Sequence, residues 1–80
     1  MEDLLRAISI LKNFNIDYDP VSKLQQVEKI LWSKNIKPTD VTMAIELIAN
    51  DDEDLAEEHI EQAIEDLERI YKVRKFQQSK

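Results

Sequence analysis

The chain has 80 residues, a net charge of −6, and neither cysteine nor glycine. This length supports one domain, and the lack of cysteine excludes a disulfide framework and thiolate chemistry. The lack of glycine disfavours phosphate-binding loops, dinucleotide-binding turns and EF-hand loops, which need glycine at a sharp turn or a close backbone approach. We therefore expect a small protein built from helices whose ends use Asn, Asp and Pro.

The N-terminal sequence MEDLLRAISIL lacks the basic start of a secretory signal peptide and carries Glu2 and Asp3 instead. No apolar run comes near the ~20 residues that a membrane-spanning helix requires. Because small secreted domains usually depend on disulfide bonds, we expect a cytoplasmic protein that does not bind membranes.

The first helix is predicted to begin at residue 2 and to end at residue 13 or 14, with acidic residues at its start and Lys12 near its end, as the helix dipole favours. Apolar residues occupy more than half of its circumference, so we expect it to be covered on more than one side. Its inner stripe is formed by Leu4, Ala7, Ile8 and Leu11.

The second helix is predicted from Pro20 to about residue 34. The pair Asp19-Pro20 places a carboxylate at the N-cap position and proline at the first helical position. Asn35 is expected to end the helix in a left-handed C-cap, and Ile36 to make the hydrophobic contact back onto the last turn.

The third helix is predicted over residues 40–49, with Thr39 as its N-cap. Only Asp40, Thr42 and Glu46 interrupt its apolar residues. Because a helix that is apolar nearly all round is usually buried nearly all round, we predict that this helix is the centre of the core.

The fourth helix is predicted over residues 51–75, where apolar residues recur at spacings of three and four. Its seam covers about a third of the circumference, so one groove can cover it. The seam is formed by Ala56, Ile60, Ala63, Leu67 and Ile70. The helix would be ~36 Å long, and we expect its contact with the bundle to end near Tyr71 and its last turns to extend beyond it.

These patterns together predict an all-α fold. We expect a small four-helix bundle in which three short helices form a groove that receives one long C-terminal helix. The single domain is expected to span residues 1–76, and residues 77–80 are expected to form a frayed C-terminal tail.

The charges are segregated along the chain. Residues 38–68 carry twelve acids and no base, whereas residues 69–80 carry five bases and no acid. One interpretation is a solvated helix face whose charges suit the helix dipole. The other is a surface that steers a basic partner, because like charges four residues apart mildly destabilise a helix and a solvated face does not need them. The residues of this surface are Glu57, Glu58, Glu61, Glu65 and Glu68.

No signature of catalysis, of a cofactor or of a metal site is found in the sequence. His59 is the only histidine and lacks the acid three residues before it that di-iron bundles use. Residues 51–54 are acidic but lack the glycine turn of a calcium loop. An acidic helical chain of this length resembles the acyl carrier proteins, but no serine here is preceded by Asp and followed by Leu, as their attachment site requires. We predict that the protein is not an enzyme.

Two of the predicted helices and the turn between them resemble a helix-turn-helix motif. The resemblance rests on Asn35 and Ile36 in the turn and on Val41 and Ile45 as inward residues of the following helix. It implies a regulator that binds nucleic acid. The would-be recognition helix has no Lys or Arg, however, whereas duplex binding depends largely on phosphate neutralisation. Nucleic-acid binding is therefore an alternative and not the leading prediction.

The leading prediction is a non-enzymatic protein-interaction module, such as an inhibitor, an immunity-type protein or an adaptor, with a basic protein partner. Its contact surface is expected to be the acidic helix face, or a patch formed by Trp32 with Val21 on the same side of the second helix. A further alternative is a structural homodimer. Its interface would be the end of the fourth helix, with Tyr71, Val73 and Phe76.

Overall fold

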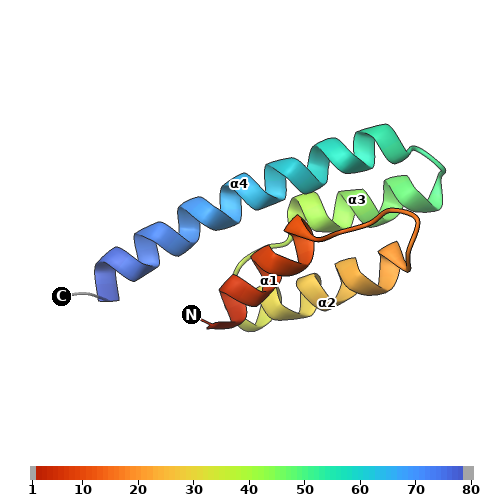
Figure 1. The fold of residues 1–80 in the computed structure, drawn as a ribbon. Coiled ribbons are helices and arrows are strands. Elements are labelled where there is room, and N and C mark those ends of the chain that lie inside the picture. The colour runs from red at the N-terminus through yellow and green to blue at the C-terminus, as the bar shows by residue number, and fades with distance from the viewer. Residues whose placement is uncertain (1, 79–80) are drawn as a thin grey trace.

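The computed structural model describes residues 2–78, and four α-helices account for most of them (Figure 1). They are α1 (Glu2–Lys12), α2 (Pro20–Ser33), α3 (Thr39–Ala49) and α4 (Glu53–Gln78). No strand occurs in this part of the chain. The prediction of an all-α bundle of three short helices and one long C-terminal helix is confirmed.

The helices pack in a ring around the core. α1 packs against α2 and α4, and α3 packs against the same two helices. The core lies between the four helices, and the residues that fill it are at most 5% exposed: Leu4, Ala7, Ile8, Leu11, Leu24, Val27, Leu31, Val41, Ala44, Ala56, Ile60, Ala63 and Leu67.

The prediction that α3 is the buried centre is wrong. Only Val41 and Ala44 of this helix are buried, and Met43 is 39% exposed. In a ring of four helices each member turns one side inward, so α3 leaves apolar residues at the surface although its composition would allow full burial. The core is instead lined by matching stripes from all four helices.

α2 ends in a Schellman motif without glycine. The N–H of Ile36 donates to the carbonyl oxygen of Leu31 at 2.9 Å, and the N–H of Asn35 donates to that of Trp32 at 3.1 Å. Asn35 has a φ of 59°, in the left-handed region that Asn tolerates better than most residues. The predicted left-handed C-cap is confirmed.

α3 ends in the same way. The N–H of Asp52 donates to the carbonyl oxygen of Leu47 at 2.8 Å, and the N–H of Asp51 donates to that of Ile48 at 3.1 Å. Asp51 takes the left-handed position, with a φ of 61°. Asp and Asn therefore do at these helix ends what glycine does in most proteins.

α2 and α3 begin within one residue of their predicted starts, but the predicted capping interactions are absent. Pro20 begins α2 as predicted, but Asp19 is left-handed, with a φ of 48°, and its side chain makes no capping hydrogen bond. Pro38, and not Thr39, is the N-cap residue of α3, and Thr39 is already helical. At neither position does a side-chain oxygen accept a hydrogen bond from the N–H groups of the first helical turn.

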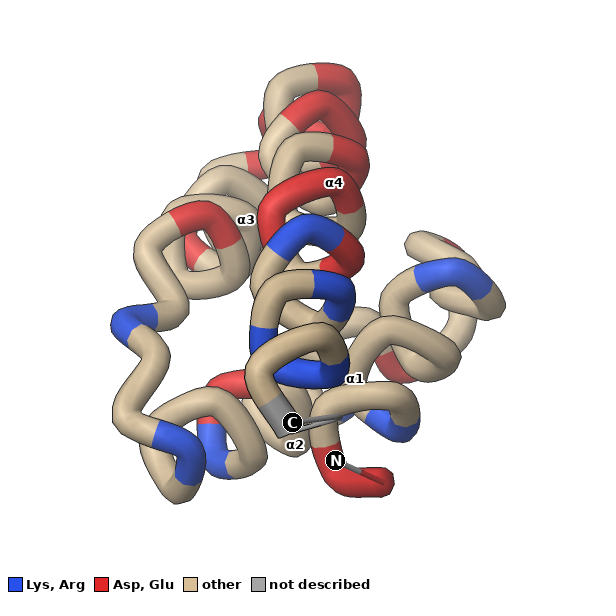
Figure 2. The backbone as a smooth tube through the Cα atoms, turned by 90° about the vertical axis from the view of Figure 1, so that its left-hand side faces the viewer, with Lys and Arg blue, Asp and Glu red and all other residues tan. Residues whose placement is uncertain are grey.

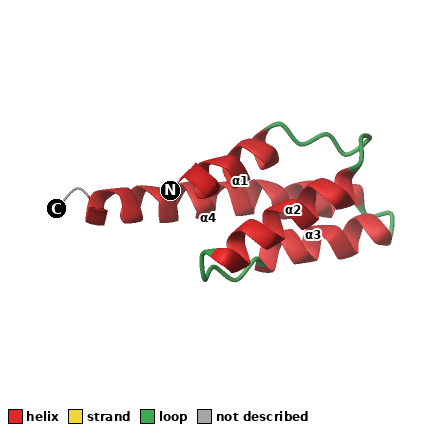
Figure 3. Cartoon of the chain, turned by 90° about the horizontal axis from the view of Figure 1, so that it is seen from below, coloured by secondary structure: helices red, strands yellow, loops and turns green. Residues whose placement is uncertain are grey.

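α4 is the longest element and gives the molecule its extents of 45 × 20 × 18 Å. Its C-terminal end projects beyond the other three helices (Figures 1 and 3). The helix continues through Gln77 and Gln78, the first half of the segment expected to be a frayed tail; Ser79 and Lys80 lie outside the described residues. None of the helices within residues 2–78 is long and apolar enough to cross a membrane.

Candidate functional site

The acidic face of α4 consists of the five glutamates named from the sequence, Glu57, Glu58, Glu61, Glu65 and Glu68. At 100° per residue they fall within an arc of about 100° around the helix. The first four are exposed and Glu68 is half-buried. Figure 2 shows the acidic residues of α4 in its N-terminal half and the basic residues toward its C-terminal end. The structure therefore brings all five predicted glutamates together on one surface.

One base of the bundle reaches the acidic face. Nζ of Lys12, at the end of α1, lies 3.2 Å from Oε2 of Glu68. Within residues 2–77 the other four glutamates form no ion pair. The Lys12–Glu68 pair compensates one of the five negative charges, and the remaining surface is strongly acidic.

A groove lies beside this face, between the end of α1, the connector that follows it, and α4. It has a volume of about 250 Å³. Its lining combines apolar side chains with one lysine and two glutamates of the acidic face: Leu11, Lys12, Phe14, Ile16, Glu57, Ile60, Glu61 and Ile64. We call this the acidic groove. The sequence analysis did not predict this groove; the local feature that could have indicated it is the pair of apolar residues, Phe14 and Ile16, in an otherwise polar connector.

Trp32 is the second predicted contact residue, and its side chain is 60% exposed. It lines a groove of about 240 Å³ together with Pro38 and Met43, at the corner between α2 and α3. Val21 is half-buried and lies eleven residues earlier on α2, about 16 Å along the axis. The structure thus places Met43 and Pro38 beside Trp32, where the sequence predicted Val21.

His59 is half-buried on α4, as expected for a helix-face histidine. Its Nδ1 lies 3.0 Å from Oδ1 of Asp40, in the first turn of α3. The contact ties α3 to α4. No group of three His, Asp or Glu side chains among the described residues is arranged to hold a metal ion.

The C-terminal end of α4 carries the residues predicted for a homodimer. Tyr71 is half-buried, and Val73 and Phe76 are 51% and 71% exposed. Nζ of Lys75 lies 5.9 Å from the centre of the Tyr71 ring, within the range of a cation–π interaction. Two large apolar side chains are therefore presented next to bases.

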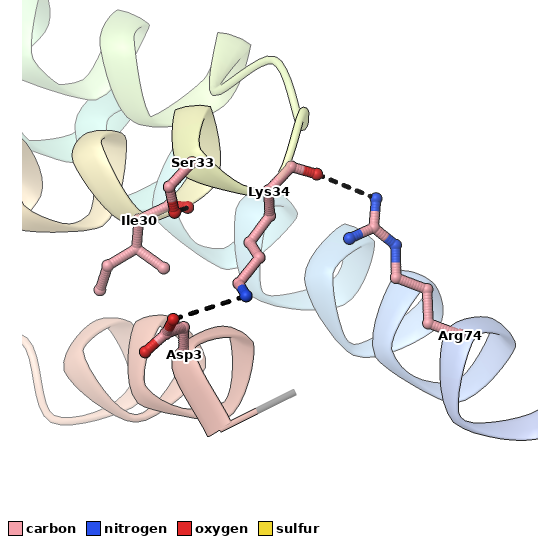
Figure 4. Close-up of polar contacts among 5 residues, drawn as sticks. All are labelled: Asp3, Ile30, Ser33, Lys34 and Arg74. Atoms are coloured by element: carbon pink, nitrogen blue, oxygen red, sulfur yellow. Dashed lines mark hydrogen bonds and ion pairs between the residues drawn. The ribbon is translucent and has the colours of Figure 1, made fainter. Parts of the chain in front are cut away.

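The contact of α4 with the bundle continues past Tyr71, where it was predicted to end. Nη2 of Arg74 donates to the carbonyl oxygen of Lys34 at 3.2 Å, and Nζ of Lys34 lies 3.5 Å from Oδ2 of Asp3 (Figure 4). In the same corner the Ser33 hydroxyl donates to the Ile30 carbonyl oxygen at 2.6 Å. These contacts join α1, the end of α2 and α4.

No family model, curated protein or solved structure matches this chain.

Proposed function

We propose that this protein is a non-enzymatic interaction module, such as an inhibitor, an immunity-type protein or an adaptor, that binds a basic protein through the acidic face of α4. The observation that carries the proposal is the presence of four exposed glutamates on one helix face with no base paired to them within residues 2–77. Such a surface raises the rate at which a basic partner associates and suppresses binding of acidic ones.

The helix dipole does not account for this surface. A dipole favours acids only in the first turn of a helix, which here holds Glu53 and Asp54. The acidic face begins at Glu57 and extends over three further turns to Glu68. Like-charged neighbours at a spacing of four, such as Glu57 and Glu61, destabilise a helix by a few tenths of a kcal/mol per pair. A contact with a basic partner would offset this cost.

The test compares two variants of equal net charge in affinity capture from cells of the source organism. The first changes Glu57, Glu58, Glu61 and Glu65 to glutamine. The matched control neutralises four exposed acids elsewhere, Glu2→Gln, Asp17→Asn, Glu46→Gln and Glu53→Gln. We expect recovery of the partner to fall about tenfold or more in the first variant and less than about twofold in the control. Equal recovery with both variants would overturn the proposal.

A third variant, Trp32→Ala, examines the other predicted surface. Exposed tryptophans contribute much of the binding energy of many interfaces, so Trp32 is the residue to test if the partner does not bind the glutamates. Loss of the partner with Trp32→Ala but not with the glutamine variant would contradict the assignment to α4. Retention with Trp32→Ala and loss with the glutamine variant is the result that we expect.

A further inference from the structure

Trp32, the only tryptophan of the chain, lies between two hollows of the surface. One is the groove of about 240 Å³ at the corner between α2 and α3, two helices that pack against each other (Figure 3). We call it the Trp32 groove. The other is a hollow of about 410 Å³ on the outer side of α2. Because Trp32 lines both, they form one surface with the exposed indole at its middle.

The Trp32 groove suits a single apolar side chain. Its volume lies below the ~300–1,000 Å³ of pockets that hold drug-sized ligands, which favours one inserted side chain over a cofactor. Pro38, which is buried, lines the groove together with the exposed residues Trp32 and Met43. Tryptophan and methionine are residues that protein interfaces favour. The lining therefore indicates contact with a protein.

Bases flank Trp32 on both sides. Lys37 lines the Trp32 groove, and Lys29, one helical turn before Trp32, lines the hollow on α2. Both lysines are exposed, and neither forms an ion pair within the described part of the chain. The acid that lines the hollow, Glu28, accepts a hydrogen bond at its Oε2 from the Thr42 hydroxyl at 2.6 Å. The surface around Trp32 thus offers two unpaired ammonium groups in a chain of net charge −6.

The basic part of this surface is short. On α3 the next charged residue after Met43 along the outer side is Glu46, which is exposed. Single-stranded nucleic acid also combines a group that stacks on an aromatic ring with negative charge, but its binding sites follow the backbone with a continuous basic groove. Two lysines that flank one small apolar groove fit a few carboxylates around an apolar side chain better.

The Trp32 groove and the acidic face of α4 lie on different sides of the molecule. α1 and α3 each pack against both α2 and α4, so α2 and α4 lie diagonally across the ring. Trp32 and the glutamates of the acidic face are on the outer sides of these two helices. A segment bound at one surface therefore leaves the other accessible.

We propose that the Trp32 groove binds an acidic segment of another protein. One apolar side chain of this segment packs against Trp32, Pro38 and Met43, and its carboxylates pair with Lys29 and Lys37. Charge complementarity selects this occupant, because it supplies the carboxylates that the chain itself does not place beside the two lysines. The inference goes beyond the proposed function, since it adds a ligand of the opposite charge at a separate surface.

Fluorescence quenching of Trp32 tests the charge around the indole before any ligand is added. Because the chain has no other tryptophan, quenching by iodide and by caesium reports on this residue alone. At constant ionic strength, Lys29→Gln/Lys37→Gln should lower the ratio of iodide to caesium quenching about twofold, because nearby cations attract the anion. The control Arg6→Gln/Lys72→Gln has the same net charge and changes exposed bases elsewhere, so it should leave the ratio unchanged. Equal ratios in the two variants contradict the inference.

A random peptide library tests the occupant. Peptides are selected on the wild type and depleted on Trp32→Ala, so that only those that need the indole remain. We expect them to carry one large apolar residue among several Asp and Glu. They should bind Lys29→Gln/Lys37→Gln about tenfold more weakly than the control variant, with circular dichroism as the check on folding. If no peptide depends on Trp32, or if those that do lack acidic residues, the inference is wrong.

Truncation of Met43 locates the apolar contact. Met43→Ala should weaken the selected peptides about fivefold, whereas Leu55→Ala, which truncates an exposed apolar residue of α4, should change their affinity less than about twofold. The reverse order would place the apolar side chain outside the Trp32 groove.

Two further measurements distinguish other occupants. A single-stranded thymidine oligonucleotide that binds more tightly than the selected peptides, and no longer binds Trp32→Ala, would assign the groove to nucleic acid. Self-association in sedimentation velocity that Trp32→Ala abolishes would assign it to a second copy. Either result overturns the inference. The selected peptides should bind the four-glutamine variant of the acidic face within about twofold of the wild type, so each of the two proposals can fail without the other.

Discussion

Arg74 and Lys34, forty residues apart, are joined by a hydrogen bond of 3.2 Å from the Arg74 guanidinium to the Lys34 carbonyl oxygen. Lys34 is the C-cap residue of α2, where backbone carbonyls lack partners within the helix and the dipole favours a cation. Arg74 follows the apolar seam of α4 at the point where its large apolar residues end. The charged residue thus extends the contact of α4 with the bundle by about one turn beyond Tyr71.

Arg74→Ala is expected to lower the free energy of unfolding by about 1 kcal/mol, because it removes a partly buried hydrogen bond to a helix end. Urea unfolding followed by circular dichroism measures the change. The control is Arg69→Ala, whose ion pair to Asp66 at 3.9 Å joins two residues of the same helix. Its effect should stay below about 0.5 kcal/mol. Equal midpoints for the two variants would contradict the role given to Arg74.

Asp51→Gly is expected to stabilise the protein by about 1 kcal/mol, because glycine occupies the left-handed region without the steric cost that other residues carry. A gain of this size corresponds to a rise of roughly 4–8 °C in melting temperature for a domain of this length. Asp51→Ala should lower the melting temperature. Asp51→Asn removes the charge but keeps a residue that tolerates this conformation, so it separates backbone strain from repulsion among the acids. If Asn stabilises as much as glycine, strain at Asp51 is not the cause.

Leu67→Ala and Leu55→Ala compare two leucines of α4 that differ strongly in burial. Leu67 is 3% exposed and Leu55 is 45% exposed. The first variant is expected to lose about 2–5 kcal/mol because it leaves a cavity in the core, and the second less than about 1 kcal/mol. Thermal unfolding of both, monitored at the same wavelength, measures the difference. Losses of similar size would mean that the seam of α4 does not face the core.

The four-glutamine variant of the acidic face is expected to be more stable than the wild type by several tenths of a kcal/mol at low salt, because like-charged neighbours on α4 are removed. The difference should shrink as salt screens the remaining charges. Melting temperatures of both proteins at low and high salt give the measurement. A variant that binds its partner less well yet unfolds at higher temperature would mark these glutamates as residues kept for binding; a less stable variant would show that they support the fold.

Much of the fold was predictable because helix formation depends on near neighbours in the sequence. Apolar spacing located the four helices, Pro20 marked the start of α2, and Asn35 marked its end. The capping chemistry was less predictable. Asp19 precedes α2 with a left-handed backbone, and its carboxylate accepts no capping hydrogen bond. Its backbone conformation depends on the path of the connector before it, which residue spacing does not give.

The burial of α3 and the neighbours of the two candidate surfaces could not be read from the pattern. The apolar residues of α3 were correctly identified, but the number of helices that cover it depends on the arrangement of the whole bundle. Trp32 was predicted as a candidate contact residue at the edge of the second helix, whereas its neighbours Pro38 and Met43 belong to other segments, whose approach to Trp32 the sequence does not state.

The helices, the seam of α4 and the division of α4 into an acidic and a basic half were predictable, because they follow from residue spacing along one helix. The groove beside Glu57 and Glu61 is seen only in the packed bundle, where Phe14 and Ile16, after the end of α1 at Lys12, lie next to α4. The physical reason is that a helical wheel orders the residues of one helix around its own axis. A groove, by contrast, depends on the distance between helices, which the packing of the whole core sets.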